Sequence, residues 1–417
     1  TIFDTISYAK GSSVLHMLHN YLGPANFQKG LHLYLEKHAY KNTHTHHLWE
    51  ALSEASGKDV AAFMKNWTTE PGFPVVKLEG DRVSQQRFYL AQPSQPTNTI
   101  WQVPLLTEPQ HDLELLDRAS GQISAGTLLN SGRCGFYRVA YDPETIHKLA
   151  QQVKQGDMQP TDRLGMLSDS FEVAKAGYAD TLGSLELLAS YADEDNAAVW
   201  DIIGMAVGDL RGVMGTDDEI RQSMKPFVAK LVKKQLDRLG WEPKKDESHF
   251  DTLLRPSILG FASFAEVPEV LAEIQRRFKA MTKPEDCPPD LRGVIWNTIA
   301  RHGDTKDFDT FLKWHHQSTN SELRVTLSAV LTGFEDPELT VRALAIVKTK
   351  DVRLQDAAYW IAYAFMNRFA RDTTWQWMQD NWDWLEANLG TDLSFSRCPI
   401  YAARVFTGDK YLKEFKA

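Results

Sequence analysis

The sequence holds few residues whose types and spacing could do chemistry, and the densest group is a run of histidines. His44, His46 and His47 stand at the entry to an expected helix, and His46 lies four residues before Glu50. Imidazole and carboxylate groups four residues apart share one face of a helix, which is the geometry that hydrolytic zinc sites use. No second histidine follows at the required offset, and His-Glu-x-x-His occurs nowhere in the chain. A solvated turn at a helix start is the favoured interpretation, and adventitious metal affinity is the alternative.

Two further histidine pairs lead to the same interpretation. His16 and His19 stand three residues apart on one expected helix, which brings their imidazoles close together, yet no carboxylate accompanies them locally. His315 and His316 are adjacent, so a helix directs them to different sides. We expect structural roles for all four residues, and the sequence predicts no metal ligand in this chain.

Motifs for nucleophilic catalysis and phosphate binding are absent from the sequence. Neither Gly-x-Ser-x-Gly nor Gly-x-x-x-x-Gly-Lys-Ser/Thr occurs. Cys134, Cys287 and Cys398 are too few and too widely spaced for a disulfide framework or a Cys-type zinc site. No cysteine stands in a motif that activates thiols.

Two stretches could form binding surfaces. The aromatic run from Tyr359 to Trp384 could stack on peptides, but its helical spacing favours packing between helices. The stretch from Lys225 to Arg238 is basic on one side of an amphipathic helix. We interpret that side as a solvated face, with an anionic partner as the alternative.

Composition and charge exclude several classes of protein. The 417 residues are 43% hydrophobic and 24% charged, close to the globular average, which excludes disordered, collagen-like and coiled-coil chains. The net charge of −9 disfavours a nucleic-acid partner. No window approaches the ~18 uncharged apolar residues that a membrane span needs, so no membrane partner is expected. Low cysteine usage and the lack of a signal segment lead us to expect a cytoplasmic location.

The elements that must position these residues fall into three parts. Apolar residues at helical spacing predict three or four helices over residues 1–70. Short β-type runs between Gly, Pro, Asn and Ser clusters predict a small β-sandwich, immunoglobulin-like in kind, over 71–145. Residues 146–417 read as successive helices and predict a large α-solenoid of the HEAT or armadillo type. The fold class is therefore mainly α. The β-type runs are 73–78, 82–91, 100–106, 112–116, 122–129 and 135–141.

The chain starts abruptly. Thr1-Ile2-Phe3-Asp4 includes no Met and leads into a helical pattern without a basic or apolar leader. We expect the chain to be a piece of a longer protein, and a mature N-terminus is the alternative.

Several short sequence motifs follow one another along the chain. The first is Phe3-Asp4-Thr5-Ile6-Ser7-Tyr8-Ala9-Lys10-Gly11, followed after Met64-x-x-Trp67-Thr68 by Pro71-Gly72-Phe73-Pro74-Val75. The later motifs are Asn130, Gly135-Phe136-Tyr137-Arg138-Val139, Asp162-Arg163, Leu167-x-Asp169-x-Phe171, Leu239-Gly240-Trp241, Gln355-Asp356 and Asn381-Trp382. Together they resemble the zinc aminopeptidases of the aminopeptidase N and puromycin-sensitive type. The resemblance covers essentially the whole chain.

The resemblance implies the architecture and the cofactor. Residues 1–70 would be helices that end a thermolysin-like catalytic domain, 71–145 a spacer sandwich and 146–417 a helical bowl. Members of the family remove N-terminal residues from peptides with zinc held by His-Glu-x-x-His and a downstream Glu. This sequence lacks that motif, so zinc is expected in the full-length enzyme and none on this chain. The implied partners are the N-terminal and catalytic domains of the same protein and peptide substrates.

Two residues correspond to functional positions of the family. Tyr8 matches the catalytic Tyr of its Ser-Tyr-x-Lys-Gly stretch, which donates to the oxyanion formed at the scissile carbonyl. A phenol is protonated at neutral pH, so it can donate a hydrogen bond to developing negative charge. Phe3 corresponds to a substrate-binding side chain at the pocket for the first substrate residue. His47 replaces the family's usual Asp before Leu-Trp, and a weaker helix start is expected there because Asp is the better N-cap.

Three functions stay open at this point. The first is the C-terminal portion of a zinc aminopeptidase that is inactive alone and gates access to the active site. The second is a non-catalytic scaffold that retains the aminopeptidase architecture. The third is a free-standing helical solenoid that binds peptides without metal.

Overall fold

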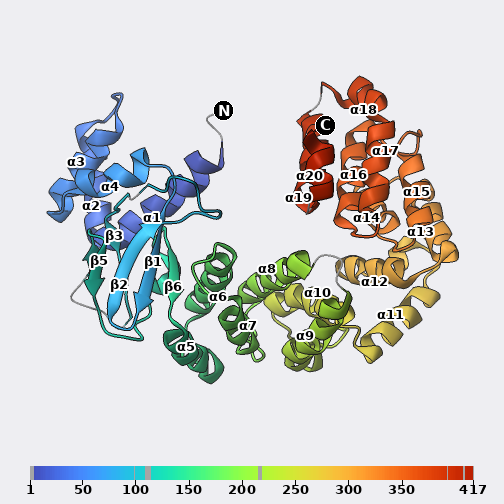
Figure 1. Cartoon of the computed structure of the whole chain (residues 1–417), viewed down its shortest axis with the longest axis horizontal. Coiled ribbons are helices and arrows are strands. Elements are labelled where there is room, and N and C mark those ends of the chain that lie inside the picture. Colours follow the sequence, from blue (N-terminus) through green and yellow to red (C-terminus); the bar gives the residue numbers. More distant parts are fainter. Residues whose placement is uncertain are drawn as a thin grey trace. The chain divides into compact units, whose positions relative to one another are not determined.

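The computed structural model describes residues 4–97, 99–108, 114–214, 218–391, 393–406 and 409–416. The chain forms two compact units, Thr1–Leu210 and Arg211–Ala417. In Figure 1 the first unit runs from blue to green along the sequence colours, and the second continues to red. The expected boundaries near 70 and 145 fall inside the first unit, so the three-part division stays a prediction.

The first unit begins with the helices that the apolar spacing predicts. They are the π-helix η1 (Ile6–Lys10), α1 (Gly11–Leu22), α2 (Pro24–Lys37), α3 (Thr45–Ser56) and α4 (Val60–Thr69). Gly23 has a φ of 80°, which lets α1 end and α2 begin within one residue. Asp59 caps α4 by accepting a hydrogen bond from the backbone N–H of Ala62 at 2.9 Å.

The start of α3 differs from the expectation for His47. The N-cap is His44, and His47 is the third residue inside the helix. The backbone N–H of His44 donates to Nδ1 of His47 at 3.1 Å, so the imidazole helps to close the helix start. The interpretation of His47 as a weaker N-cap is wrong, because the helix begins at Thr45, before the apolar pattern does.

A small mixed sheet follows the helices. Its strands are β1 (Pro74–Glu79), β2 (Arg82–Arg87), β5 (Ser120–Gln122) and β6 (Arg138–Tyr141), in the order β5-β2-β1-β6. β1 pairs antiparallel with β2, with Val76 opposite Gln85, and parallel with β6, with Val76 opposite Val139. A separate two-stranded ribbon joins β3 (Val103–Pro104) to β4 (Leu115–Leu116). A mainly α fold with a small sheet is confirmed, and the sandwich arrangement stays a prediction.

Much of the predicted strand content between 88 and 129 is irregular. Around Trp101, a buried side chain takes the place of strand pairing, because Gln85 satisfies backbone groups there. Its amide donates to the carbonyl oxygens of Trp101 at 2.8 Å and Leu116 at 3.0 Å. Its Oε1 accepts from the backbone N–H of Trp101 at 3.0 Å. Part of the run predicted over 112–116 lies outside the described residues.

One hydrophobic core joins the helices to the sheet. It contains Leu18, Trp67, Trp101 and Val139, which come from α1, α4, a loop and β6. The indole N–H of Trp67 donates to the carbonyl oxygen of Gln102 at 3.2 Å, which satisfies its polar atom within the core. The helices before the sheet are therefore held by the same apolar contacts as the strands.

The first unit continues with α5 (Pro143–Gln155), α6 (Pro160–Lys175) and α7 (Thr181–Ala189), and it ends at Leu210, within α8 (Ala197–Met214). Asp142 joins β6 to α5: it accepts from the backbone N–H of Thr145 and from that of Gly80, each at 2.8 Å. Helix α6 packs on β6 and on the 3-10 turn η2 (Ser131–Arg133). This contact positions the site described below.

Helices make up the described part of the second unit. They are α9 (Asp218–Leu239), α10 (His249–Phe264), α11 (Pro268–Ala280), α12 (Pro289–His302), α13 (Thr305–Gln317), α14 (Ser321–Leu331), α15 (Pro337–Ile346), α16 (Ala357–Met366), α17 (Arg371–Asp380), α18 (Trp382–Leu389), α19 (Leu393–Val405) and α20 (Asp409–Lys416). Two 3-10 turns, η3 (Pro284–Asp286) and η4 (Leu354–Asp356), lie between them. Helices α10, α12, α14, α16 and α19 contact one another in sequence (Figure 1).

Second-unit side chains confirm part of the sequence interpretation. Trp360 is fully buried, as expected for the aromatic run, whereas Trp382 is exposed. His315 is buried and His316 is exposed, which confirms that these neighbours face different sides. The HEAT or armadillo type of the packing stays a prediction. Within the described residues, no helix has the length and apolarity that crossing a membrane requires.

Candidate functional site

Tyr8 lies at the start of the first helix, in a turn of π-helix. The side chain of Asp4 accepts from the backbone N–H of Ser7 at 2.7 Å, and its carbonyl oxygen accepts from the N–H of Tyr8 at 3.1 Å. The turn then passes directly into α1. Single π-turns inside helices occur frequently at functional sites. Tyr8 is 58% exposed, so most of its side chain is accessible to a ligand.

Lys10 anchors this turn to the rest of the unit. Its ammonium group donates to the carbonyl oxygen of Glu70 at 3.1 Å and approaches that of Gly72 at 3.5 Å. Burial and the nearby Arg87 lower the pKa of Lys10. The sequence motif includes Lys10, but sequence reasoning assigned it no function. These bonds hold the helical turn that carries Tyr8 against the α4–β1 connection.

The exposed residues of this segment include apolar side chains among polar ones such as Asp4, Ser7 and Ser12. Ile6 is 73% exposed and Leu15 is 40% exposed, while Met17 and Leu18 on the opposite side of α1 are fully buried. Phe3, the predicted substrate-binding residue, lies outside the described residues.

The histidines gather without forming a metal centre. The rings of His38 and His46 lie 4.5 Å and 4.1 Å from that of His47, measured between centroids. His19 packs edge-on against Phe27 at 5.1 Å. Over the part of the chain that the structure describes, no group of three or more His, Cys, Asp or Glu side chains could hold a metal ion. We therefore derive no chemical step through a metal from these residues.

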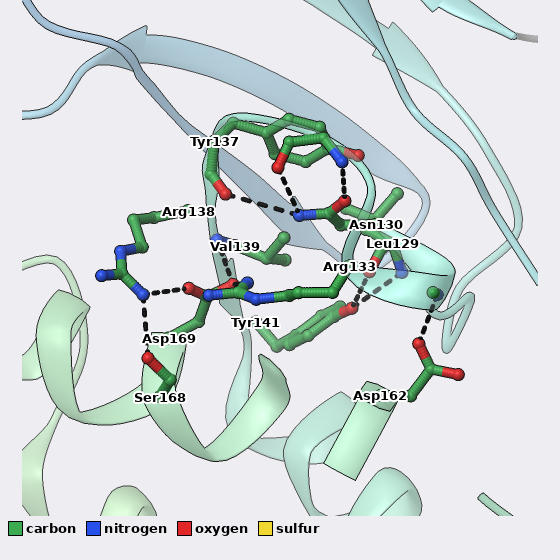
Figure 2. Close-up of polar contacts among 12 residues, drawn as sticks. Leu129, Asn130, Arg133, Tyr137, Arg138, Val139, Tyr141, Asp162, Ser168 and Asp169 are labelled. Atoms are coloured by element: carbon green, nitrogen blue, oxygen red, sulfur yellow. Dashed lines mark hydrogen bonds and ion pairs between the residues drawn. The ribbon is translucent and has the colours of Figure 1, made fainter. Parts of the chain in front are cut away.

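A second polar cluster lies where β6 meets α6, and Figure 2 shows its contacts. Asp169 on α6 is 3% exposed and accepts hydrogen bonds from three donors. They are the guanidinium groups of Arg133 at 2.5 Å and Arg138 at 2.9 Å, and the backbone N–H of Val139 at 3.1 Å. Arg138 also donates to the hydroxyl of Ser168 at 3.0 Å. This cluster, which we call the Asp169 joint, ties the end of the sheet to the helix.

The turn before β6 has the backbone shape that the Asp169 joint requires. Asn130 adopts a left-handed conformation with a φ of 57°, and its side-chain oxygen accepts from the N–H of Gly135 at 2.7 Å. A Cβ on Gly135 would lie 2.2 Å from the ring of Tyr137, so only glycine fits. A Cβ on Gly165 would lie 2.5 Å from Cδ of Arg133, so this glycine leaves room for the arginine to reach Asp169.

Other contacts strengthen the Asp169 joint. Asp162 accepts from the backbone N–H of Gly132 at 2.6 Å, and burial raises the pKa of this carboxyl against the effect of that bond. The hydroxyl of Tyr141 accepts from the backbone N–H of Leu129 at 2.8 Å (Figure 2). Burial raises the pKa of Tyr141 above the range in which it could ionise. These bonds fix the turn before β6 against α6, which indicates a structural role for the Asp169 joint.

The structure brings together motifs that stand far apart in the sequence. Asn130, Arg138, Asp162 and Asp169 all belong to the stretches that carry the family resemblance, and all lie in the Asp169 joint. Sequence reasoning quoted them but did not expect them to meet. One signal was present, because a buried Asp in an apolar helix one turn after Gly165 indicates a partner that approaches closely.

Family comparisons agree with this geometry. The model of the ERAP1-like C-terminal domain matches residues 127–417, and that of the peptidase family M1 domain matches residues 1–67. The first match covers more than half of the chain and includes the Asp169 joint, and the second includes Tyr8. The chain belongs to the M1 aminopeptidase family.

Individual relatives are similar over most of the chain. Aminopeptidase 2 of Candida albicans is 32% identical over 94% of this chain and 45% of its own length. Aminopeptidase M1-D of Oryza sativa subsp. japonica is 31% identical over 92% of this chain and 47% of its own length. Aminopeptidase N of Lactococcus lactis subsp. lactis is 30% identical over 100% of this chain and 51% of its own length. The chain thus spans about half the length of the curated relatives it matches.

Proposed function

We propose that this chain is part of an aminopeptidase that removes N-terminal residues from peptides, with Tyr8 as a catalytic hydrogen-bond donor. One observation carries the proposal: Tyr8 is exposed at a π-turn, within the segment that matches the M1 domain. Its neutral hydroxyl can donate to the carbonyl oxygen of a peptide as negative charge develops there. Lys10 holds the helical turn that carries Tyr8 against the α4–β1 connection.

The remaining catalytic groups would come from outside this sequence. Zinc, which the family resemblance implies, does not fit the described residues because they hold no suitable group of ligands. We propose that a segment outside this sequence holds the metal and docks on the exposed face around Ile6 and Tyr8. On its own, this chain would then be inactive.

Residues 71–145 would act as a spacer and residues 146–417 as a bowl-shaped wall that restricts access to small peptides. The Asp169 joint supports the spacer role, since it couples the sheet to α6 through a fully engaged carboxylate. The match of residues 127–417 to a domain of M1 relatives supports the role of the helical part.

Reconstitution tests this proposal. The chain is mixed with a separately produced polypeptide encoded upstream of it, and hydrolysis of fluorogenic aminoacyl amides is measured. We expect hydrolysis by the mixture and none by this chain on its own. Tyr8→Phe should lower kcat by about 10²–10³, because one oxyanion donor is lost, while KM changes by less than about threefold. Tyr40→Phe is the matched control, since Tyr40 is also exposed in the first unit, and it should leave kcat unchanged.

Two results would contradict the proposal. A Tyr8→Phe mixture with wild-type kcat would remove Tyr8 from the catalytic machinery. A mixture that assembles and binds zinc but hydrolyses no aminoacyl amide would favour the scaffold alternative. Size-exclusion chromatography separates that second result from a simple failure to assemble.

A further inference from the structure

A cavity of about 380 Å³ in the second unit gathers positive charge. Its cationic lining comes from three places that are distant in the sequence: Arg221 and Lys225 on α9, Arg301 in the last turn of α12, and Arg368 after α16. Its acidic lining is Asp218, Glu266 and Glu335. The solvated-face interpretation of the Lys225–Arg238 stretch is wrong for Lys225, whose side chain is 15% exposed.

Two of the cations are matched. The ammonium of Lys225 lies 2.6 Å from a carboxylate oxygen of Glu266. The guanidinium of Arg368 donates to Asp218 at 2.9 Å, but its Nε is buried without a hydrogen-bond partner. These two pairs use two of the three carboxylates that line the cavity.

Arg221 and Arg301 are left with one carboxylate between them. Among the described residues, neither guanidinium forms a hydrogen bond or a close ion pair. At longer range, Asp218 and Glu335 act on Arg221, and Glu335 and Glu266 act on Arg301. Arg211 adds a further cation beside them: its guanidinium stacks on the ring of Phe264 at 4.6 Å. Burial, together with Arg301, Arg221 and Arg368, lowers the pKa of Arg211 to about 10.

The charges do not cancel within this cluster. Among the described residues, four cations and three carboxylates line the cavity, which leaves an excess of one positive charge, and Arg211 adds a further cation beside the lining. The excess is local, because the chain as a whole carries a net charge of −9. Elsewhere in the same unit, a buried arginine is matched, since Arg255 is paired with Glu247. Arginines crowded together without partners repel one another and cost stability, and a bound anion would reduce that repulsion.

The partial negative charge at the end of a helix explains the position of Arg301 only. Arg301 lies in the last turn of α12, where the carbonyl ends of the helix carry a partial negative charge that favours a cation. The described residues contribute no backbone carbonyl hydrogen-bonded to Arg221 or Arg301. Their planar forks of N–H donors therefore remain available, and this geometry suits the oxygen atoms of phosphate.

We propose that this cavity binds a compact oxyanion with two negative charges, of the class of inorganic phosphate and small phosphate monoesters. Such an ion offsets two charges, the excess charge of the lining and that of Arg211, and accepts hydrogen bonds from Arg221 and Arg301. The rings of Phe264 and Phe369 line the same cavity and provide an apolar wall for a small ester group. The inference does not rest on the aminopeptidase proposal, because it uses residues of the second unit alone.

Calorimetric titration of the full chain tests the proposal. Inorganic phosphate and phenyl phosphate are titrated separately at about pH 7.5, where both are largely dianions, at constant ionic strength. We expect saturable binding at one site.

Arg301→Gln should weaken phosphate binding at least about tenfold, as expected for loss of a charge-assisted hydrogen bond. Arg276→Gln, which removes an exposed arginine on α11, is the matched control and should stay within about twofold. If phenyl phosphate binds more tightly than phosphate, the apolar wall contacts the ester group of the ligand.

Three outcomes would overturn the proposal. They are the absence of saturable binding up to ~10 mM, an equal loss of affinity in the Arg276→Gln control, and binding of acetate as tight as that of phosphate. Acetate is a monoanion and cannot offset two charges. Circular dichroism checks that Arg301→Gln folds. Arg221→Gln, which lies on another helix and should also weaken binding at least about tenfold, keeps the test decisive if the first variant does not fold.

Discussion

The Asp169 joint and the arginine cavity both concentrate arginines, but they differ in how the charge is matched. At the joint, Asp169 accepts from Arg133, Arg138 and a backbone N–H, and it is almost completely buried. In the cavity, Arg221 and Arg301 have no hydrogen-bonded carboxylate among the described residues. Arginine therefore forms a structural contact at the Asp169 joint, whereas in the cavity its N–H donors stay available to a ligand.

The difference shows that the partner, and not the arginine, decides the function of such a cluster. A buried carboxylate with three donors is costly to remove, because the donors would stay buried without it. An arginine without a close partner is repelled by its like-charged neighbours, so its removal should not destabilise the fold. Stability measurements on variants can therefore separate the two kinds of site.

Asp169→Asn should have the largest effect. The substitution removes the charge that Arg133 and Arg138 share, and breaking a buried ion pair costs about 3–5 kcal/mol. We expect the urea midpoint of the first unit to fall by roughly 1–2 M, followed by tryptophan fluorescence. Asp201→Asn changes an exposed acid of the same unit and should leave the midpoint unchanged. Equal midpoints for Asp169→Asn and the wild type would show that the joint is not structural.

A variant of His315 tests whether the lack of a hydrogen-bond partner also affects stability when the buried side chain is neutral. Its ring is buried against Trp360 at 5.3 Å and its Nδ1 has no hydrogen-bond partner, so burial, aided by Arg324, lowers its pKa to about 4 from 6.5. Between these values the unfolded chain binds a proton that the folded chain does not. Its stabilising contribution is therefore full above pH 6.5 and is lost as the pH falls toward 4, by about 3 kcal/mol.

The measurement compares urea unfolding of the wild type and His315→Leu across this pH range. The variant should lack the extra loss of stability at low pH. His316→Leu, which alters the exposed neighbour, should keep it. If wild type and His315→Leu show parallel pH profiles, His315 titrates normally and the burial argument does not hold.

Gly165→Ala should weaken the Asp169 joint by displacing Arg133, a partner of Asp169. Alanine favours the helix by up to ~1 kcal/mol, but its Cβ would press on Cδ of Arg133 and displace the guanidinium from Asp169. We expect a net loss of about 1–2 kcal/mol in the free energy of unfolding. Gly208→Ala on α8 meets nothing within 4 Å and should instead be stabilising, by about 0.5–1 kcal/mol. Two variants with the same sign would contradict the role of Gly165.

Arg301→Gln should have the smallest effect on stability. The guanidinium has no carboxylate to lose and is repelled by its neighbours, so we expect a change within about 0.5 kcal/mol. Arg138→Gln at the joint should cost about 1–3 kcal/mol, because Asp169 loses a donor. Thermal unfolding of both variants gives the comparison. A loss at Arg301 as large as that at Arg138 would make the cavity a second structural joint.

The sequence predicted the elements near Tyr8 well and the region after β2 poorly. Helices α1 to α4 and strand β1 follow from apolar spacing and from breaks such as Gly23, which act over a few residues. The run predicted over 100–106 is almost entirely irregular, because the Gln85 amide pairs with its backbone. Nothing in the local pattern around Trp101 indicates a partner sixteen residues away.

The amino-acid sequence by itself determined the helical segments, the family and the identity of Tyr8 as a candidate donor. All three depend on residue types at short spacing or on ordered motifs. Only the tertiary structure decided that Asp169 would be fully matched and that Arg301 would not. Charge matching depends on which distant side chains meet, and the four arginines around the cavity span residues 211–368. Local patterns carry no information about such meetings, because the packing of whole helices brings them about.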